Sequence, residues 1–210
     1  MAFYAGLEAD NSRSYWQAHK STYDESVKAP FAALSEVVAK EFGALRLFRP
    51  HRDTRFSKDK TPYKTAQGAV TEGRGGTMYY VAFSAEGLYA GSGYYMFAPD
   101  QLERWREAVA DGKSGPALER ALKGVLAKKY EAASRDALKS APRGYDKDHP
   151  RIELLRRKGL HVGREFGAPK WIHTKAAADR IVQVWRDAAP VDKWLDKYVG
   201  PSEEAPPEPE

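Results

Sequence analysis

The stretch from His51 to Lys64, HRDTRFSKDKTPYK, concentrates side chains whose chemistry suits the binding of an anion. Six basic residues and two acidic residues lie between positions 49 and 64. An Arg side chain presents a planar fork that binds a carboxylate or a phosphate through two hydrogen bonds, and a Lys adds a point charge. We therefore predict an oxyanion site. Its cations would be Arg52, Arg55, Lys58, Lys60 and Lys64, and Tyr63 would orient the ligand.

The same segment also admits a purely structural interpretation. Asp53 and Asp59 could each neutralise a basic neighbour, and the block would then fix the fold without binding a ligand. Two acids cannot pair six bases, however, so this interpretation leaves several cations unexplained. Pro62 disfavours a helix, which predicts an extended strand that turns into a loop.

A second polar cluster lies in Pro142–Pro150, PRGYDKDHP. Arg143 could add a cation to the anion site, and Asp146 and His149 could act as acid and base or supply two metal ligands. The simpler interpretation is structural, with Asp148 capping a helix over 151–158. If the protein catalyses a reaction, its proton carrier is expected among Asp53, Asp146 and His149. A shared site requires the 52–64 and 143–149 segments to meet in space.

Two functions from different classes follow from these residues. The first is a pocket that binds a phosphate- or carboxylate-bearing small molecule, and whether it also catalyses a reaction stays open. The alternative is a nucleic-acid-binding module, in which aromatic side chains stack on bases beside the basic segment. Aromatic side chains of sheets are more often buried in the core than exposed for stacking. The aromatics in question are Tyr79, Tyr80, Tyr89, Tyr94, Tyr95 and Phe97.

The elements that must position these residues change in type along the chain. Apolar residues at helical spacing predict one helix after Asn11-Ser12 and a second that begins near Pro30. Residues 45–48, 66–70, 77–83 and 88–97 read as strands. The strand at 77–83 has apolar residues on both faces and is expected to be central and covered on both sides. Gly91 and Gly93 predict a bulge or a close approach of two backbones. Pro99, Pro116 and Thr174 mark the starts of later helices. The order indicates an α+β fold, with a mostly antiparallel central sheet flanked by N-terminal and C-terminal helices.

Composition sets the remaining expectations. The 210 residues carry a net charge of +5 and no cysteine, which excludes disulfides and thiolate metal sites and fits a cytoplasmic protein. The histidines form no pair at zinc-binding spacing, so no metal is expected. No motif in the sequence indicates which cofactor, if any, the protein binds. No apolar run is long enough for a membrane span, and the N-terminus does not read as a signal peptide. We expect a single domain over 1–200 and a disordered acidic Pro/Glu tail over 201–210.

Three blocks together resemble a known family. NSRSYW near the N-terminus, RDTRFSKDKTPYK in the basic segment and PRGYDKDHP in the second cluster are similar to the bacterial DUF2461 family. The resemblance extends over nearly all of the chain before the acidic tail. It implies a compact α+β domain and supplies no catalytic residues, so the roles above rest on side-chain chemistry.

Overall fold

The computed structural model describes residues 1–55, 57–72 and 76–204. Its strands are β1 (Arg46–Leu47), β2 (Ala66–Glu72), β3 (Met78–Ser84), β4 (Leu88–Tyr94), β5 (Glu131–Ala133) and β6 (Leu160–Gly167). Its helices are α1 (Ala2–Ala9), α2 (Arg13–Ala18), α3 (Lys20–Tyr23), the π-helical turn η1 (Asp24–Lys28), α4 (Ala29–Phe42), α5 (Pro99–Ala110), α6 (Ser114–Ala127), α7 (Ile152–Leu155), the 3-10 turn η3 (Lys170–His173) and α8 (Ala176–Tyr198).

The strands form one sheet in the order β1-β2-β3-β4-β6-β5, and each neighbouring pair is antiparallel. Helices precede and follow the sheet in sequence, which confirms the predicted α+β class and the antiparallel sheet. β3 lies in the middle, where Val81 pairs with Ala69 on one side and with Ala90 on the other. β6 lies between β4 and β5 in the sheet. The two edge strands are therefore β1 and the short strand β5.

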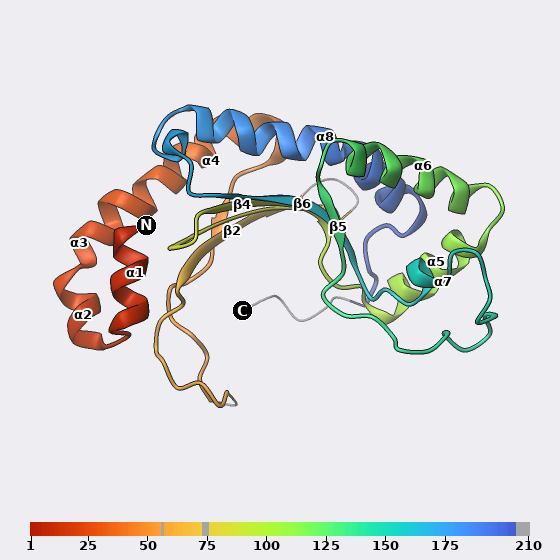
Figure 1. The fold of residues 1–210 in the computed structure, drawn as a ribbon, viewed down its shortest axis with the longest axis horizontal. Coiled ribbons are helices and arrows are strands. Elements are labelled where there is room, and N and C mark those ends of the chain that lie inside the picture. The colour runs from red at the N-terminus through yellow and green to blue at the C-terminus, as the bar shows by residue number, and fades with distance from the viewer. Residues whose placement is uncertain (56, 73–75, 205–210) are drawn as a thin grey trace.

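Helices α4 and α8 run along one face of the sheet, which we call the helix face (Figure 1). Val81 is fully buried on this face, and the Tyr79 ring lies 5.5 Å from the Trp185 ring of α8. Tyr80 and Tyr89 belong to the opposite face, are only partly buried, and are not part of the buried core cluster. The prediction that helices or other layers cover the central strand on both sides is therefore wrong. Tyr is amphipathic, so a strand with Tyr on its second face resembles a fully buried strand in sequence.

Two of the N-terminal helices, α2 and α4, begin where the sequence predicts, whereas α1 and the separate start of α3 are not part of the prediction. The Ser12 hydroxyl accepts a hydrogen bond from the Tyr15 N–H at 3.1 Å, which caps α2. The expected start near Pro30 is also found, because Pro30 is the second residue of α4. A π-helical turn precedes it, and the Ala29 N–H bonds to the Asp24 carbonyl five residues back. This wider turn fits the proline, which has no N–H to donate.

The C-terminal helices bury the residues that the sequence predicts, with Trp105, Val109, Leu118 and Trp185 fully buried. The strands β5 and β6 also belong to this half, which the sequence prediction treats as helical throughout. After α8 the chain runs back along α5, where the Ser202 hydroxyl donates to Asp100 Oδ1 at 2.6 Å. Residues 205–210 of the predicted tail lie outside the described residues. Within the described part of the chain, no helix combines the length and the apolarity that a membrane crossing requires.

Candidate functional site

Residues 49–55 and 57–64 form the two sides of a hairpin at the β1 edge of the sheet. His51 and Tyr63 form an isolated antiparallel bridge. The Arg52 N–H donates to the Pro62 carbonyl at 2.9 Å, and the Lys64 N–H donates to the Pro50 carbonyl at 2.7 Å. At both positions the proline contributes only its carbonyl oxygen as an acceptor. Proline fits there because no backbone N–H is required of it. The predicted extended strand and loop are confirmed.

Tyr63 anchors this hairpin to the N-terminal helices. Its ring stacks on the Trp16 ring with 4.5 Å between centroids and 8° between planes, and the residue is only 4% exposed. The Asn11 side chain accepts a hydrogen bond from the Tyr63 N–H at 3.0 Å and donates to the Tyr63 carbonyl at 3.1 Å. The structure therefore gives Tyr63 a packing position, and it does not line the pocket described next.

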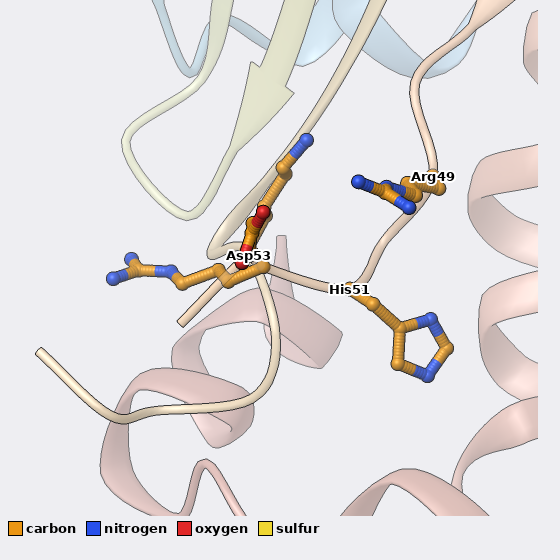
Figure 2. A pocket seen from close by; sticks show the side chains of 5 residues that line it. Arg49, His51 and Asp53 are labelled. Carbon is orange, nitrogen blue, oxygen red and sulfur yellow. The ribbon is translucent and has the colours of Figure 1, made fainter. Parts of the chain in front are cut away.

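The hairpin borders an open pocket of about 320 Å³, which we call the basic pocket. It is lined by Arg49, His51, Arg52, Asp53 and Lys64. Figure 2 shows the Arg49 guanidinium directed toward Asp53 across the pocket, while the His51 ring points away from both. That ring lies 5.0 Å from the Tyr63 ring, on the side of the N-terminal helices. Three cations and one carboxylate face a small volume, an arrangement that attracts an anion.

Several predicted ligands of the anion are engaged within the hairpin itself. Arg55 grips Asp53 with Nε at 3.0 Å from Oδ1 and Nη2 at 2.5 Å from Oδ2. Arg52 pairs with Asp59 through Nη1, and Lys60 Nζ donates to the Thr54 carbonyl at 2.8 Å. These contacts are the internal pairing that the sequence also allowed, and they shape the loop. Lys58 is exposed and does not line the pocket.

Asp59 organises the tip of the hairpin. Its Oδ1 accepts hydrogen bonds from the Thr61 N–H at 2.9 Å and from the Thr61 hydroxyl at 2.8 Å. The two bonds from Thr61, assisted by Arg52, hold the pKa of Asp59 below its ordinary value. Asp59 therefore stays ionised and keeps Arg52 in place beside the pocket.

The second cluster lies elsewhere in the molecule. Arg143, Asp146 and His149 belong to the loop that leaves β5, at the opposite edge of the sheet from the hairpin, beside α5 and α7 (Figure 1). The sheet separates this loop from the hairpin, so Arg143, Asp146 and His149 do not join Asp53 in one site.

Local hydrogen bonds account for the polar residues of this loop. Asp146 Oδ1 accepts from the Asp148 N–H at 2.9 Å, and His149 Nδ1 accepts from the Arg151 N–H at 3.0 Å. The expected cap by Asp148 is wrong, because His149 bonds at the start of α7, which spans only Ile152–Leu155. Among the described residues, no group of three His, Asp or Glu side chains could hold a metal ion.

Comparison with known proteins agrees with the resemblance seen in the sequence. A model of the conserved hypothetical protein family DUF2461 matches residues 1–194. The chain therefore belongs to the DUF2461 family. No curated protein and no solved structure matches it.

The structure adds two residues, Arg49 and His51, to the lining of the candidate site. Arg49 lines the pocket and points into it (Figure 2), although the sequence prediction places it only in the basic window and not among the ligands. An extended segment places Arg49 and His51 on the same face, because they are two residues apart. Both line the pocket, and their position beside Lys64 depends on the register of the hairpin. That register depends on the contact between Tyr63 and Trp16, which the local sequence does not reveal.

Proposed function

We propose that the basic pocket binds the phosphate or carboxylate group of a small molecule. The observation that carries the proposal is the convergence of Arg49 and Lys64 from two antiparallel segments on one cavity, with Arg52 held beside them. Arg49 would supply a guanidinium fork and Lys64 a point charge. Arg55 and Lys60, which the sequence also suggests, would support the loop through Asp53 and Thr54.

Asp53 is the one predicted proton carrier that lines the pocket, so any catalysis at this site would involve its carboxylate. Arg55 binds both of its oxygens. Asp53 would therefore limit the negative charge that the pocket accepts and could accept a hydrogen bond from the ligand. A cytoplasmic location remains part of this proposal.

Calorimetric titration with inorganic phosphate tests the proposal. We expect Arg49→Gln and Lys64→Gln each to weaken phosphate binding by about tenfold, because a hydrogen bond to a charged group contributes roughly 1.5–3 kcal/mol. Lys40→Gln is the matched control, since it removes the same charge from an exposed position of α4. Equal weakening in all three variants would reduce the effect to net charge and overturn the proposal.

A further inference from the structure

The face of the sheet opposite α4 and α8, which we call the open face, carries a row of aromatic rings. The Phe48 and Tyr80 centroids are 6.1 Å apart, and the Tyr80 and Tyr89 centroids are 5.9 Å apart. All three residues are partly exposed, and none belongs to the buried core cluster. They come from the end of β1, from β3 and from β4, so the row crosses the strands. We call these three rings the aromatic platform.

Glycines beneath the platform explain how the rings lie. A Cβ atom built on Gly163 would stand 2.2 Å from the Tyr89 hydroxyl oxygen, and one on Gly91 would stand 2.6 Å from the same atom. A Cβ on Gly68 would stand 2.9 Å from the Tyr80 hydroxyl oxygen. Because a Cβ projects out of the sheet, rings at these positions lie along the backbone of the sheet. The hydroxyl ends of Tyr80 and Tyr89 therefore lie close above glycine backbone, where no side chain intervenes.

The charges at the two ends of the platform have opposite signs. At the Phe48 end, the Arg46 guanidinium carbon lies 5.8 Å and the Lys64 ammonium 5.6 Å from the ring centroid. At the Tyr89 end, Glu165 stands directly across from Tyr89 on β6, and Glu131 follows on β5. Burial, with Glu86 and Glu131 adding to it, raises the pKa of Glu165. Since Lys64 also lines the basic pocket, the pocket and the platform adjoin.

We propose that the ligand of the basic pocket is a mononucleotide, whose phosphate binds Arg49 and Lys64 and whose base stacks on the platform at Tyr80. This inference rests on the proposed anion site and adds the chemical class of its ligand. Stacking on aromatic side chains tolerates any base, because every base has a π face. The charge pattern favours one nucleotide over a chain of nucleotides, because Glu165 and Glu131 would repel further phosphates along the row.

Calorimetric titrations with AMP, ribose 5-phosphate and adenosine separate the two parts of the site. Stacking of one base contributes roughly 1–3 kcal/mol, so AMP is expected to bind about tenfold more tightly than ribose 5-phosphate. Tyr80→Leu is expected to abolish this difference while binding of ribose 5-phosphate stays unchanged. Tyr80→Phe, which keeps the ring, is expected to retain the difference. Arg49→Gln is expected to weaken both phosphates and to leave adenosine unaffected.

The outcomes distinguish failure of the inference from failure of the anion site. Equal affinities of wild type for AMP and ribose 5-phosphate would overturn the nucleotide inference and leave the pocket intact, and this comparison needs no variant. Phosphates that bind wild type and Arg49→Gln equally would overturn the pocket itself. A single-stranded oligonucleotide that binds more tightly than AMP, with an affinity that falls steeply with salt, would replace the mononucleotide by a polynucleotide. Tyr89→Leu provides a second ring variant if Tyr80→Leu does not fold.

Discussion

Tyr79 and Tyr80 are neighbours in β3, yet they belong to opposite faces of the sheet and to different environments. The Tyr79 ring lies 4.8 Å from the Phe42 ring and 5.5 Å from the Trp185 ring, inside the layer between the sheet and α4 and α8. The Tyr80 ring contacts Phe48 and Tyr89 instead, outside that core. Residue type therefore does not decide whether a tyrosine of this sheet packs in the core or lies outside it. What decides is which face the helices cover.

The same difference applies to the polar groups of the two faces. On the helix face, Ser92 and Asp192 are 2% and 3% exposed and hydrogen bond to each other at 2.7 Å. On the open face, Glu165 and Glu131 are exposed at the ends of neighbouring strands. A buried polar group needs a partner in the protein, while an exposed group can find one in a ligand or in water. Substitutions on the helix face should therefore change the stability of the protein more than substitutions on the open face.

The largest expected effect is that of Trp185→Ala on the helix face. Trp185 is fully buried, packs on Phe42 and Tyr79, and donates its indole N–H to the Tyr80 carbonyl. Its loss should lower the free energy of unfolding by about 3–5 kcal/mol, as for other large core truncations. Tyr80→Leu on the open face should cost about 1 kcal/mol. Urea unfolding monitored by circular dichroism compares the two, and equal losses would contradict the distinction between the faces.

The next effect is a pH dependence from Asp192. Burial raises its pKa from 3.8 to about 7, with a contribution from Asp196 and an opposing one from the Ser92 hydrogen bond. A raised folded-state pKa means that the protonated carboxyl contributes its full stability below about pH 4. That stability is lost as the pH rises through about 7.

The Asp192→Asn variant isolates this contribution, because Asn stays neutral and can still accept the hydrogen bond from Ser92. Relative to wild type, its free energy of unfolding should increase by on the order of 3 kcal/mol between pH 4 and pH 8, the size expected for a shift of this magnitude. Unfolding of both proteins across this range gives the difference directly. A constant difference would show that Asp192 has an ordinary pKa in the folded protein.

The helices α2, α4, α5, α6 and α8 and the strands β2, β3 and β4 could be predicted from sequence, because each has a local period or punctuation signal, whereas α1, β5 and β6 are absent from the prediction. Pro99 begins α5, and the apolar positions of α6 and α8 repeat at helical spacing. The predicted close approach at Gly93 is also present, since a Cβ there would meet the Leu160 carbonyl at 2.4 Å. The insertion of β6 between β4 and β5 could not be predicted, because it depends on contacts between segments about 70 residues apart.

The sequence predicts most of the residues that form the candidate site. It does not predict how their side chains lie relative to one another. The local pair of Asp53 and Arg55 follows from a spacing of two residues, and the sequence allowed it. The inward position of Arg49 depends on the register of the hairpin, which Trp16 and Asn11 set from outside the segment. The aromatic pattern predicts that Tyr79 and Tyr80 point in opposite directions, but it does not say which face the helices cover. That choice is made by tertiary packing.

A smaller effect is expected for Gly163, on which the Tyr89 ring rests. In Gly163→Ala the new Cβ would lie 2.2 Å from the Tyr89 hydroxyl oxygen and 2.9 Å from the Ala90 carbonyl, so the ring must move. The cost should be about 1–3 kcal/mol, as for other overpacked positions. In a Tyr89→Ala background the part of that cost due to the ring should disappear, while the contact with the Ala90 carbonyl remains, and a double-mutant cycle measures this coupling. Additive effects would mean that the ring does not lie on this glycine.

The smallest effect is expected for Arg55→Gln in the hairpin. The Arg55 side chain is 72% exposed, and exposed ion pairs such as its pair with Asp53 contribute about 1 kcal/mol or less. Arg151→Gln is the matched control, because that side chain is only 11% exposed and its Nε donates to the Val109 carbonyl at 2.6 Å. Its loss should cost more, since a buried carbonyl would lose its charged donor. Thermal unfolding compares the two. If Arg55→Gln proved as destabilising as Arg151→Gln, the basic residues of the hairpin would form part of the scaffold. The proposal of an anion site would then lose its argument from charge.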